Sequence, residues 1–232
     1  MCISRISNLL FFLFFLTFTF SFFAQDVDEE IDDVVYTRIK PKHTLTLELG
    51  LPIGMANKGF KEYLQGMVNF SPYYHFNFQN NLSIGIGVNY NLFKINHVLS
   101  PDVKNLGAIH SIGSFLEVGY EKFYTDRLGV DLSIKSGFSK LYLNSVNNKS
   151  IYFNIPTQLT NYIEPNFSFI LSADEYTAYR WMIGYVIQNY KFDPTRLGFK
   201  STKEISTETE EKNKLTQFLT FGFGFSYYFN QR

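Results

Sequence analysis

Seven ionisable side chains fall on the small, polar side of segments whose residues alternate between large apolar and small polar types. They are Glu48, His75, Glu117, Asp131, Lys135, Glu164 and Arg180. A two-residue period puts alternate residues on one face of a β-sheet, and isolated charges in a narrow space must pair. We therefore expect Lys135 and Arg180 to pair with carboxylates, the candidates being Glu117, Asp131 and Glu164. If the segments enclose a narrow interior, such a network of salt bridges would fill it. A gated narrow pore is the alternative.

A second group of reactive residues surrounds one long connection. Its members are His97, Asp102 and His110, with Ser100 and Ser111 nearby. No spacing rule joins these residues into a base and nucleophile pair or makes His97 and His110 a metal site. The sequence also has no nucleotide-binding loop and no Cys-x-x-Cys pair. We expect no enzymatic activity, no cofactor and no metal.

Eight segments with strict two-residue alternation must position these side chains. They cover residues 44–51, 68–78, 82–93, 110–123, 128–142, 159–171, 179–191 and 218–229. Pro72 and Pro165 fall inside two of them, where a proline removes a hydrogen-bond donor from the sheet. We expect a bulge or a gap in the hydrogen-bond ladder at each proline, or a misplaced strand end.

The connections between these segments alternate in length. Three are short, covering residues 79–81, 124–127 and 172–177, and four are longer, covering 52–67, 96–109, 144–157 and 193–214. An even number of strands with short turns at one end and long loops at the other is typical of an outer-membrane barrel. The predicted fold is an all-β, eight-stranded, antiparallel up-and-down transmembrane β-barrel.

A soluble up-and-down barrel of the lipocalin kind is the competing fold. Its wet face would carry many Lys and Glu residues, whereas here the polar face is rich in Gly, Ser, Asn and Thr. Small polar groups suit the narrow interior of an eight-stranded barrel. The opposite face, dense in Phe and Tyr, suits lipid, so the membrane barrel is favoured.

The start of the chain has the pattern of an export signal. Residues 1–24 carry Arg5, then an apolar run, then Ala24, as in a secretory signal peptide. Residues 25–42 form an acidic segment that we interpret as a periplasmic linker. The barrel is expected over residues 43–230. The 21 basic and 21 acidic residues balance, which argues against nucleic acid as a partner.

The eight amphipathic strands, the signal peptide and the aromatic end of the chain resemble the small outer-membrane β-barrels of the outer-membrane-protein-A and -X type. Within these, the chain looks most like the porin-like "outer membrane protein β-barrel domain" group. The resemblance implies the outer membrane of a Gram-negative bacterium and an N-terminus in the periplasm. It also implies that the barrel-assembly machinery reads the last strand, through Phe223, Phe225, Tyr227 and Phe229.

This orientation assigns the two rims of the barrel. An aromatic girdle at the periplasmic rim would comprise Phe76, Phe78, Tyr120, Tyr179, Trp181, Tyr227 and Phe229. The apolar register leads to Lys94, Lys140 and Lys191 near the outer rim. These lysines either extend their charges to the membrane interface or bind phosphates of lipopolysaccharide.

The expected function is non-catalytic, with a structural or surface-interaction role in the cell envelope. An accessory subunit of an outer-membrane secretion or assembly complex and a narrow solute channel are the alternatives. The expected partners are membrane lipid, lipopolysaccharide and the assembly machinery, and other envelope proteins through the acidic linker or the long loops.

Overall fold

The computed structural model describes residues 41–95, 107–145, 158–192 and 215–229. The expected signal peptide, most of the acidic linker and most of three of the four expected long loops lie outside these residues. The strands extend into the ends of two of these loops, at residues 107–109 and 144–145.

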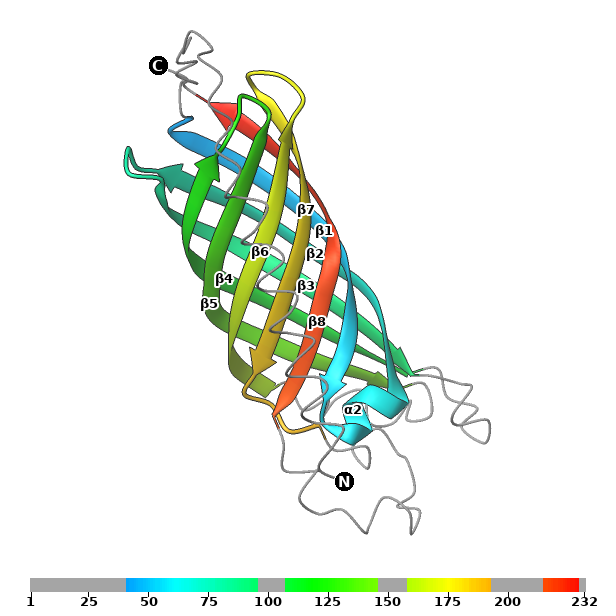
Figure 1. Ribbon diagram of the computed structural model, residues 1–232. Helices are drawn as coiled ribbons and strands as arrows, with labels where there is room; N and C mark the ends of the chain where they lie inside the picture. Colours follow the sequence, from blue (N-terminus) through cyan, green and yellow to red (C-terminus); the bar gives the residue numbers. More distant parts are fainter. Residues whose placement is uncertain (1–40, 96–106, 146–157, 193–214, 230–232) are drawn as a thin grey trace, which may run out of the picture. The chain divides into compact units, whose positions relative to one another are not determined.

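Eight strands form one closed antiparallel barrel in which each strand pairs with its neighbours in sequence (Figure 1). The strands are β1 (His43–Ala56), β2 (Leu64–Asn77), β3 (Leu82–Ile95), β4 (Gly107–Phe123), β5 (Leu128–Ser145), β6 (Gln158–Ser172), β7 (Thr177–Gln188) and β8 (Thr216–Phe229). Pairing of β8 with β1, from His43 opposite Phe229 to Ala56 opposite Gln217, closes the wall. The predicted fold class is confirmed.

Burial alternates along each strand as the two-residue period requires. In β6, for example, Tyr162, Glu164 and Asn166 are buried while the residues between them are exposed. Inward residues face the lumen and outward residues form the exterior. Short turns join β2 to β3, β4 to β5 and β6 to β7, and we call the end where they lie the short-turn end.

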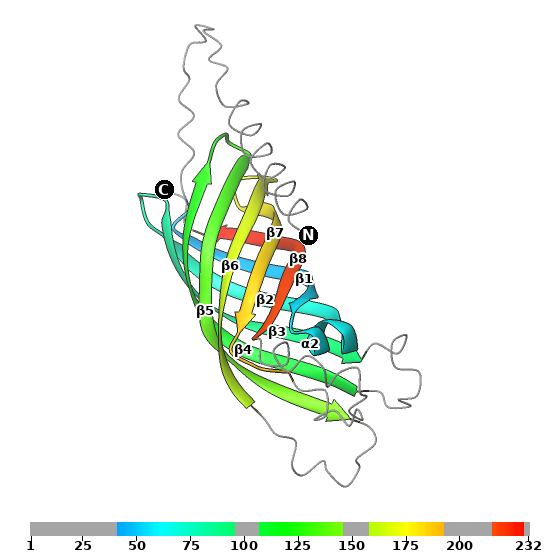
Figure 2. The same cartoon turned by 60° about the horizontal axis from the view of Figure 1, so that its bottom comes forward.

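One expected long loop is instead mostly regular structure. β1 continues to Ala56, a short helix α2 (Lys58–Tyr63) follows, and β2 begins at Leu64. Asn57 starts the helix: its side chain accepts a hydrogen bond from the Phe60 N–H at 3.1 Å, and its φ of 68° is one that Asn tolerates well. The expected connection over residues 52–67 was therefore wrong. We call this end of the barrel, brought forward in Figure 2, the α2 end.

Both prolines interrupt the ladder on one side of their strand. Pro72 pairs with Leu47 of β1, but the β2–β3 register passes from Phe70–Tyr90 to Tyr73–Gly87 without a pair between. Pro165 pairs with Ile134 of β5, and the β6–β7 register passes from Ile163–Ile187 to Asn166–Gly184. The register is the same on both sides of each gap. The expected ladder gap is therefore present, and neither strand end is misplaced.

The exterior of the barrel is more apolar than the surface of a protein dissolved in water. Among the described residues, 38 large hydrophobic side chains are exposed and 17 hydrophobic residues are buried. A soluble protein rarely exposes a continuous apolar surface of that extent, and a closed barrel satisfies its backbone hydrogen bonds within the wall, as hydrocarbon demands. The barrel therefore presents a lipid-facing wall. Within the described residues, no helix is long and apolar enough to span a bilayer.

Candidate functional site: the filled lumen

The lumen contains a buried network of charges, and Lys135 on β5 lies at one of its two centres. The Lys135 Nζ donates to Glu48 Oε2 of β1 at 2.5 Å, and neither side chain is more than 1% exposed. Tyr73 donates its hydroxyl proton to the other Glu48 oxygen at 2.8 Å, and its ring lies 4.5 Å from the Lys135 Nζ. Lys135 thus has both an ion-pair partner and an aromatic face.

Arg180 on β7 is the second centre. Its guanidinium donates to Asp131 Oδ2 at 2.7 Å, to Glu121 Oε2 and to the Ser226 hydroxyl at 2.6 Å. The side chain is fully enclosed, so Arg180 joins strands β4, β5, β7 and β8 across the interior. An enclosed Arg with several charge-assisted hydrogen bonds fixes the relative positions of those strands.

Three further groups lie in the network without a Lys or Arg partner among the described contacts. Glu117 of β4 and Glu164 of β6 are aligned with Lys135 in the sheet, one on either side. The His75 Nδ1 lies 3.8 Å from Glu117 Oε1, and its Nε2 lies 3.9 Å from Glu121 Oε2. We call His75 and the seven charged groups Glu48, Glu117, Glu121, Asp131, Lys135, Glu164 and Arg180 the lumen network.

The structure places the seven residues singled out in the sequence on the inward face and confirms one of the expected partners, since Asp131 pairs with Arg180. Within the described residues, no Lys or Arg nitrogen lies at ion-pair distance from Glu117 or Glu164. Lys135 instead reaches across to Glu48. Sequence reasoning missed Glu121, although its position four residues after Glu117 gives it the same inward parity.

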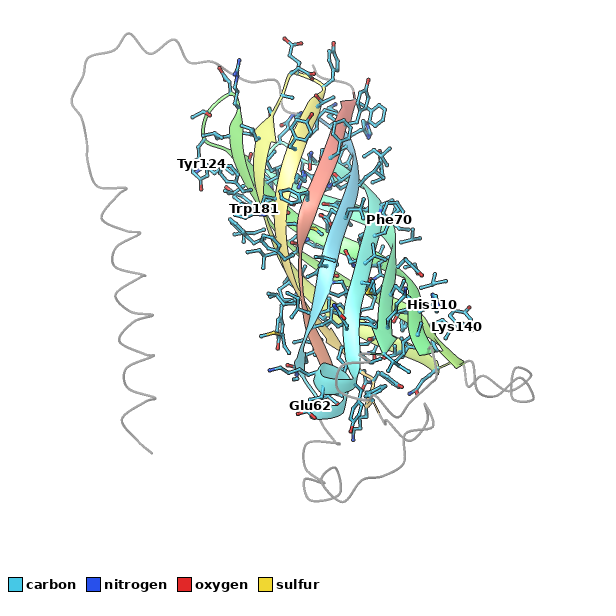
Figure 3. The ribbon with its side chains drawn as sticks, turned by 90° about the vertical axis from the view of Figure 1, so that its right-hand side faces the viewer. Glu62, Phe70, His110, Tyr124, Lys140 and Trp181 are labelled. Carbon is cyan, nitrogen blue, oxygen red and sulfur yellow. The ribbon has the colours of Figure 1, made fainter. Side chains whose placement is uncertain are left out.

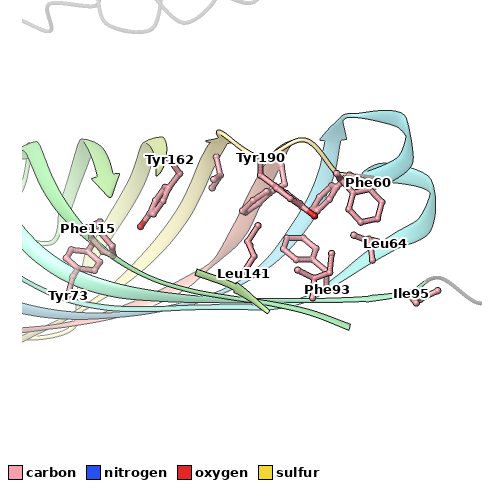
Figure 4. Close-up of a cluster of buried hydrophobic side chains, with 13 residues drawn as sticks. Phe60, Leu64, Tyr73, Phe93, Ile95, Phe115, Leu141, Tyr162 and Tyr190 are labelled. Carbon is pink, nitrogen blue, oxygen red and sulfur yellow. The ribbon is translucent and has the colours of Figure 1, made fainter. Parts of the chain in front are cut away.

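Toward the α2 end, the lumen is filled by apolar side chains (Figure 4). We call this set the apolar plug: Phe60, Leu64, Tyr73, Phe93, Ile95, Ile109, Phe115, Leu141, Tyr162, Val186, Tyr190, Phe192 and Phe218. On β4, β5 and β7 the plug residues Ile109, Leu141 and Val186 lie closer to the α2 end than every network residue. Phe60 of α2 closes the mouth, with its ring 4.8 Å from that of Phe93 and 6.3 Å from that of Phe218.

The expected small polar residues are present on the inner face at this end, for example Asn69, Asn91 and Ser111, but the large apolar side chains among them were not expected. Inward glycines make room for the rings. A Cβ on Gly87 would lie 2.5 Å from the Tyr73 Cβ and 2.6 Å from the Phe115 Cζ. In the sequence, a glycine at an inward position near large inward rings was the signal that could have indicated the apolar plug.

The short-turn end is less completely closed. Tyr228, Ile170 and Ala178 form a small buried cluster there, with Phe123 packed against it. Beside it lies a pocket lined by Pro41, Asn77, Phe78, Asn81, Glu121 and Phe123, with about 20 Å³ of space, enough for one water molecule. Glu121 thus connects this pocket to the lumen network.

The residues assigned to the aromatic girdle all belong to the short-turn half of the barrel and face outward. Their rings form edge-on pairs, with centroids 5.0 Å apart for Phe76 and Phe78 and 4.7 Å apart for Tyr227 and Phe229. Figure 3 shows Trp181 toward the same end as Tyr124 of the β4–β5 turn. This is the placement that an interfacial girdle would need.

The three outward lysines lie toward the opposite end. Lys94 and Lys140 are exposed on β3 and β5, and Figure 3 shows Lys140 toward the same end as Glu62 of α2. The Lys140 Nζ lies 5.3 Å from the centre of the Tyr142 ring. Lys191 is also exposed, but it follows the end of β7 at Gln188, so the expected strand end was wrong there.

The described part of the second reactive group does not form a catalytic pair. His110 and Ser111 are adjacent on β4 and face opposite sides of the wall; the His110 Nδ1 lies 2.9 Å from the Tyr90 hydroxyl. His97, Ser100 and Asp102 lie outside the described residues. No group of three or more His, Cys, Asp or Glu residues in the described ranges has the geometry of a metal site.

No family model matches the sequence, and no curated protein matches it. Solved structures are similar in fold. The outer membrane protein OprG from Pseudomonas aeruginosa aligns with a TM-score of 0.50 and 10% identity over 83% of this chain and 99% of that one. Neisserial surface protein A aligns at 0.49 and 8%, over 81% and 97%, and Ail, the attachment invasion locus protein of Yersinia pestis, at 0.45 and 9%, over 82% and 99%. The likeness to OprG shows that the chain has the fold of small outer-membrane barrels, as the sequence pattern predicted.

Proposed function

We propose that this protein is a non-catalytic barrel of the Gram-negative outer membrane with a structural or surface-interaction role, and that its lumen does not conduct. The observation that carries this proposal is the filled interior. Two cations bind three carboxylates in the middle of the barrel, and the apolar plug occupies the α2 half. A narrow solute channel needs a continuous wet path, and the ion pairs and the apolar plug together support an interior that interrupts it.

Conductance in planar lipid bilayers tests this proposal. The purified barrel should give no stable unitary currents. The control is the double variant Phe60→Ala, Phe218→Ala, which removes two rings of the plug and should give brief, noisy openings. Stable unitary currents from the unaltered protein would contradict the proposal and support a channel.

The orientation that fits this role has the short turns in the periplasm and the α2 end outside. In this orientation Lys94 and Lys140, which are exposed on the lipid-facing side of the wall toward the α2 end, would lie in the outer leaflet. A lysine costs several kcal/mol at the bilayer midplane but almost nothing near the interface. We propose that these two lysines, with Lys191, bind the phosphates of lipopolysaccharide in the outer leaflet.

Lipopolysaccharide retained by the purified barrel tests this contact. The triple variant Lys94→Gln, Lys140→Gln, Lys191→Gln should retain several-fold less lipid than the unaltered barrel. Lys122→Gln, an exposed lysine near the short-turn end, is the matched control and should retain the normal amount. Equal retention in all three proteins would exclude the contact and leave the lysines as interfacial residues only.

A further inference from the structure

The lumen network has more acids than bases. Five carboxyl groups face inward and are buried: Glu48, Glu117, Glu121, Asp131 and Glu164. Among the described residues, the permanent cations that face them are Lys135 and Arg180 alone. If every carboxyl group were ionised, the enclosed space would hold a net negative charge, which costs several kcal/mol per uncompensated ion.

Both cations of the lumen network already form ion pairs. Lys135 binds Glu48, and Arg180 binds both Asp131 and Glu121. Glu121 also lines the pocket at the short-turn end, which has room for one water molecule. Glu117 and Glu164 remain, and neither has a Lys or Arg nitrogen at ion-pair distance in the described part of the barrel.

Glu117 is the more isolated of these two carboxyl groups. Its side chain is 0% exposed, and neither carboxylate oxygen accepts a hydrogen bond from a described residue. An ionised carboxylate can accept about four hydrogen bonds and has no donor to offer. Burying it without donors is among the costliest placements of a side chain.

His75 faces this group and is equally isolated. Its ring is 1% exposed, and neither ring nitrogen has a hydrogen-bond partner in the described part of the chain. One nitrogen faces Glu117 at 3.8 Å and the other faces Glu121 at 3.9 Å. The imidazole thus stands between a buried carboxyl group and one that the pocket reaches.

We propose that Glu117 and His75 form a proton-binding site inside the barrel that is loaded from the short-turn end. A hydronium ion in the pocket gives a proton to the Glu121 carboxylate and leaves as water. The proton then passes from Glu121 to His75 Nε2, and the proton on Nδ1 passes to Glu117 Oε1, once these pairs close from 3.9 and 3.8 Å to hydrogen-bond distance. Charge and atoms balance, because the relay moves one proton and leaves the neutral imidazole in its other tautomer. The apolar plug blocks the same route from the α2 end.

The charged and titratable groups that face the pair come from three other strands and from β2 and β4, the strands of the pair itself. They are Glu48 of β1, Tyr73 of β2, Glu121 of β4, Asp131 and Lys135 of β5, and Arg180 of β7. Burial, Arg180 and Lys135 oppose a positive charge on His75. Burial and the neighbouring carboxylates oppose a negative charge on Glu117, against the attraction of Lys135 and Arg180. A neutral His75 beside a protonated Glu117 satisfies both groups.

Infrared spectroscopy in an ester-free detergent at neutral pH tests the site. The barrel should show a carboxylic-acid carbonyl band that shifts in deuterium oxide and loses intensity in Glu117→Gln. Glu62→Gln, on the exposed face of α2, is the matched control and should leave the band unchanged. A spectrum with no band that depends on Glu117 would overturn the proposal.

The folding of the variants provides a second readout. Gln reproduces the shape and neutrality of a protonated Glu, so Glu117→Gln should fold with an unchanged unfolding midpoint. Failure of this variant to fold would count against the proposal. Glu117→Asp, which keeps the carboxyl group, should shift the band in frequency instead of removing it.

The side from which the proton enters is tested by blocking each end. In a Cys2→Ser background, which removes the single cysteine of the chain, a bulky maleimide is attached to Phe78→Cys at the pocket or to Glu62→Cys on α2. Deuterium uptake by the Glu117 band should slow several-fold only with the label at residue 78. Slowing by the label at residue 62 alone, or equal rates with both labels, would overturn the proposed entry route.

Discussion

At the scale of single residues, the Lys135–Glu48 pair shows what an enclosed ion pair contributes to this barrel. Both groups are removed from water and bonded at 2.5 Å, so removing either partner leaves a charge without compensation. We expect Lys135→Met to lower the free energy of unfolding by about 3–5 kcal/mol. Glu48→Gln should cost less, because the amide still accepts the Tyr73 hydrogen bond.

The double variant separates pairing from burial. Lys135→Met combined with Glu48→Gln should cost less than the sum of the two single changes, with a coupling of about 0.5–3 kcal/mol. Denaturant unfolding in lipid vesicles measures all three variants. Lys122→Met is the control, since Lys122 is exposed and lies over a ring, that of Tyr124, at 5.1 Å. Strict additivity of the two single changes would show that the pair contributes no energy of its own.

Asp174 in the β6–β7 turn gives a pH-dependent test outside the membrane. The Thr177 hydroxyl and the N–H groups of Tyr176 and Thr177 donate to its carboxylate, and these bonds hold the pKa of Asp174 below its usual range. A carboxyl group with a lowered folded pKa stabilises the turn above about pH 3.9 and loses that effect as the pH falls through the folded pKa.

We therefore expect the Thr177 amide signal in nuclear magnetic resonance spectra to titrate with a pKa below about 3.9. Thr177→Val removes the hydroxyl donor and should move that pKa up toward the ordinary value. In Asp174→Asn, the acid titration of the Thr177 amide should be absent. A titration that persists in Asp174→Asn would assign the pH dependence to another group.

The residue types of the lumen network could be predicted from sequence, but their pairing could not. The two-residue alternation of the strands is enough to place Lys135 and Arg180 on the inward face. Which carboxylate each cation meets depends on how strands on opposite sides of the barrel align across the lumen, and no local pattern encodes that. Lys135 has Glu117 and Glu164 beside it in the sheet, yet it bonds to Glu48 of β1 across the interior.

At the scale of elements, α2 is more than a connection between β1 and β2. It carries Phe60 into the α2 end of the lumen, where the ring contacts Phe93, Phe192 and Phe218. Six residues form no stable helix by themselves, so the helix depends on the Asn57 cap and on this packing. That dependence explains why sequence periodicity missed α2: the element is shorter than the window in which a helical period can be recognised.

Phe60→Ala tests the role of α2 as a cap. Loss of a buried Phe side chain typically costs about 3–5 kcal/mol, and we expect a loss of that size in the free energy of unfolding. Amide exchange in α2 should also accelerate. Lys61→Ala, which changes an exposed residue of the same helix, is the control and should lie within about 0.5 kcal/mol of the unaltered protein. A Phe60→Ala barrel as stable as the control would mean that the plug holds without its cap.

The strands were the most predictable elements, because each combines outward hydrophobic residues with small or polar inward ones over many residues. β3 and β8 show this pattern most clearly, and sequence located both within two residues of their ends. Where the inward face turns apolar, as at Tyr73, Phe93 and Phe115, alternation no longer distinguishes the two faces. The apolar plug was hidden for that reason.

At the scale of the whole molecule, the barrel has two unlike halves inside a uniform wall. The exterior is apolar along every strand, whereas the interior changes from charged groups to aromatic rings toward the α2 end. A charged compartment thus faces the short-turn side, and the apolar plug, set among small polar side chains, faces the other. Such a barrel can hold surface loops in the outer membrane without opening a path for solutes.

The last strand links this architecture to assembly. β8 closes the barrel against β1, and its outward residues end in Tyr227 and Phe229. If the assembly machinery reads this aromatic end, Phe229→Ala should reduce the folded fraction in cells several-fold.

Phe169→Ala is a close control for Phe229→Ala. Phe169 is 40% exposed and Phe229 is 41% exposed on the same exterior, so the two changes remove similar lipid contact. Heat-modifiable electrophoretic mobility measures the folded fraction, and refolding into vesicles gives the intrinsic stability of each variant. If Phe229→Ala and Phe169→Ala reduce the folded fraction in cells equally, Phe229 acts only as a lipid contact. If Phe229→Ala reduces it in cells without a matching loss of stability in vesicles, Phe229 is part of the assembly signal.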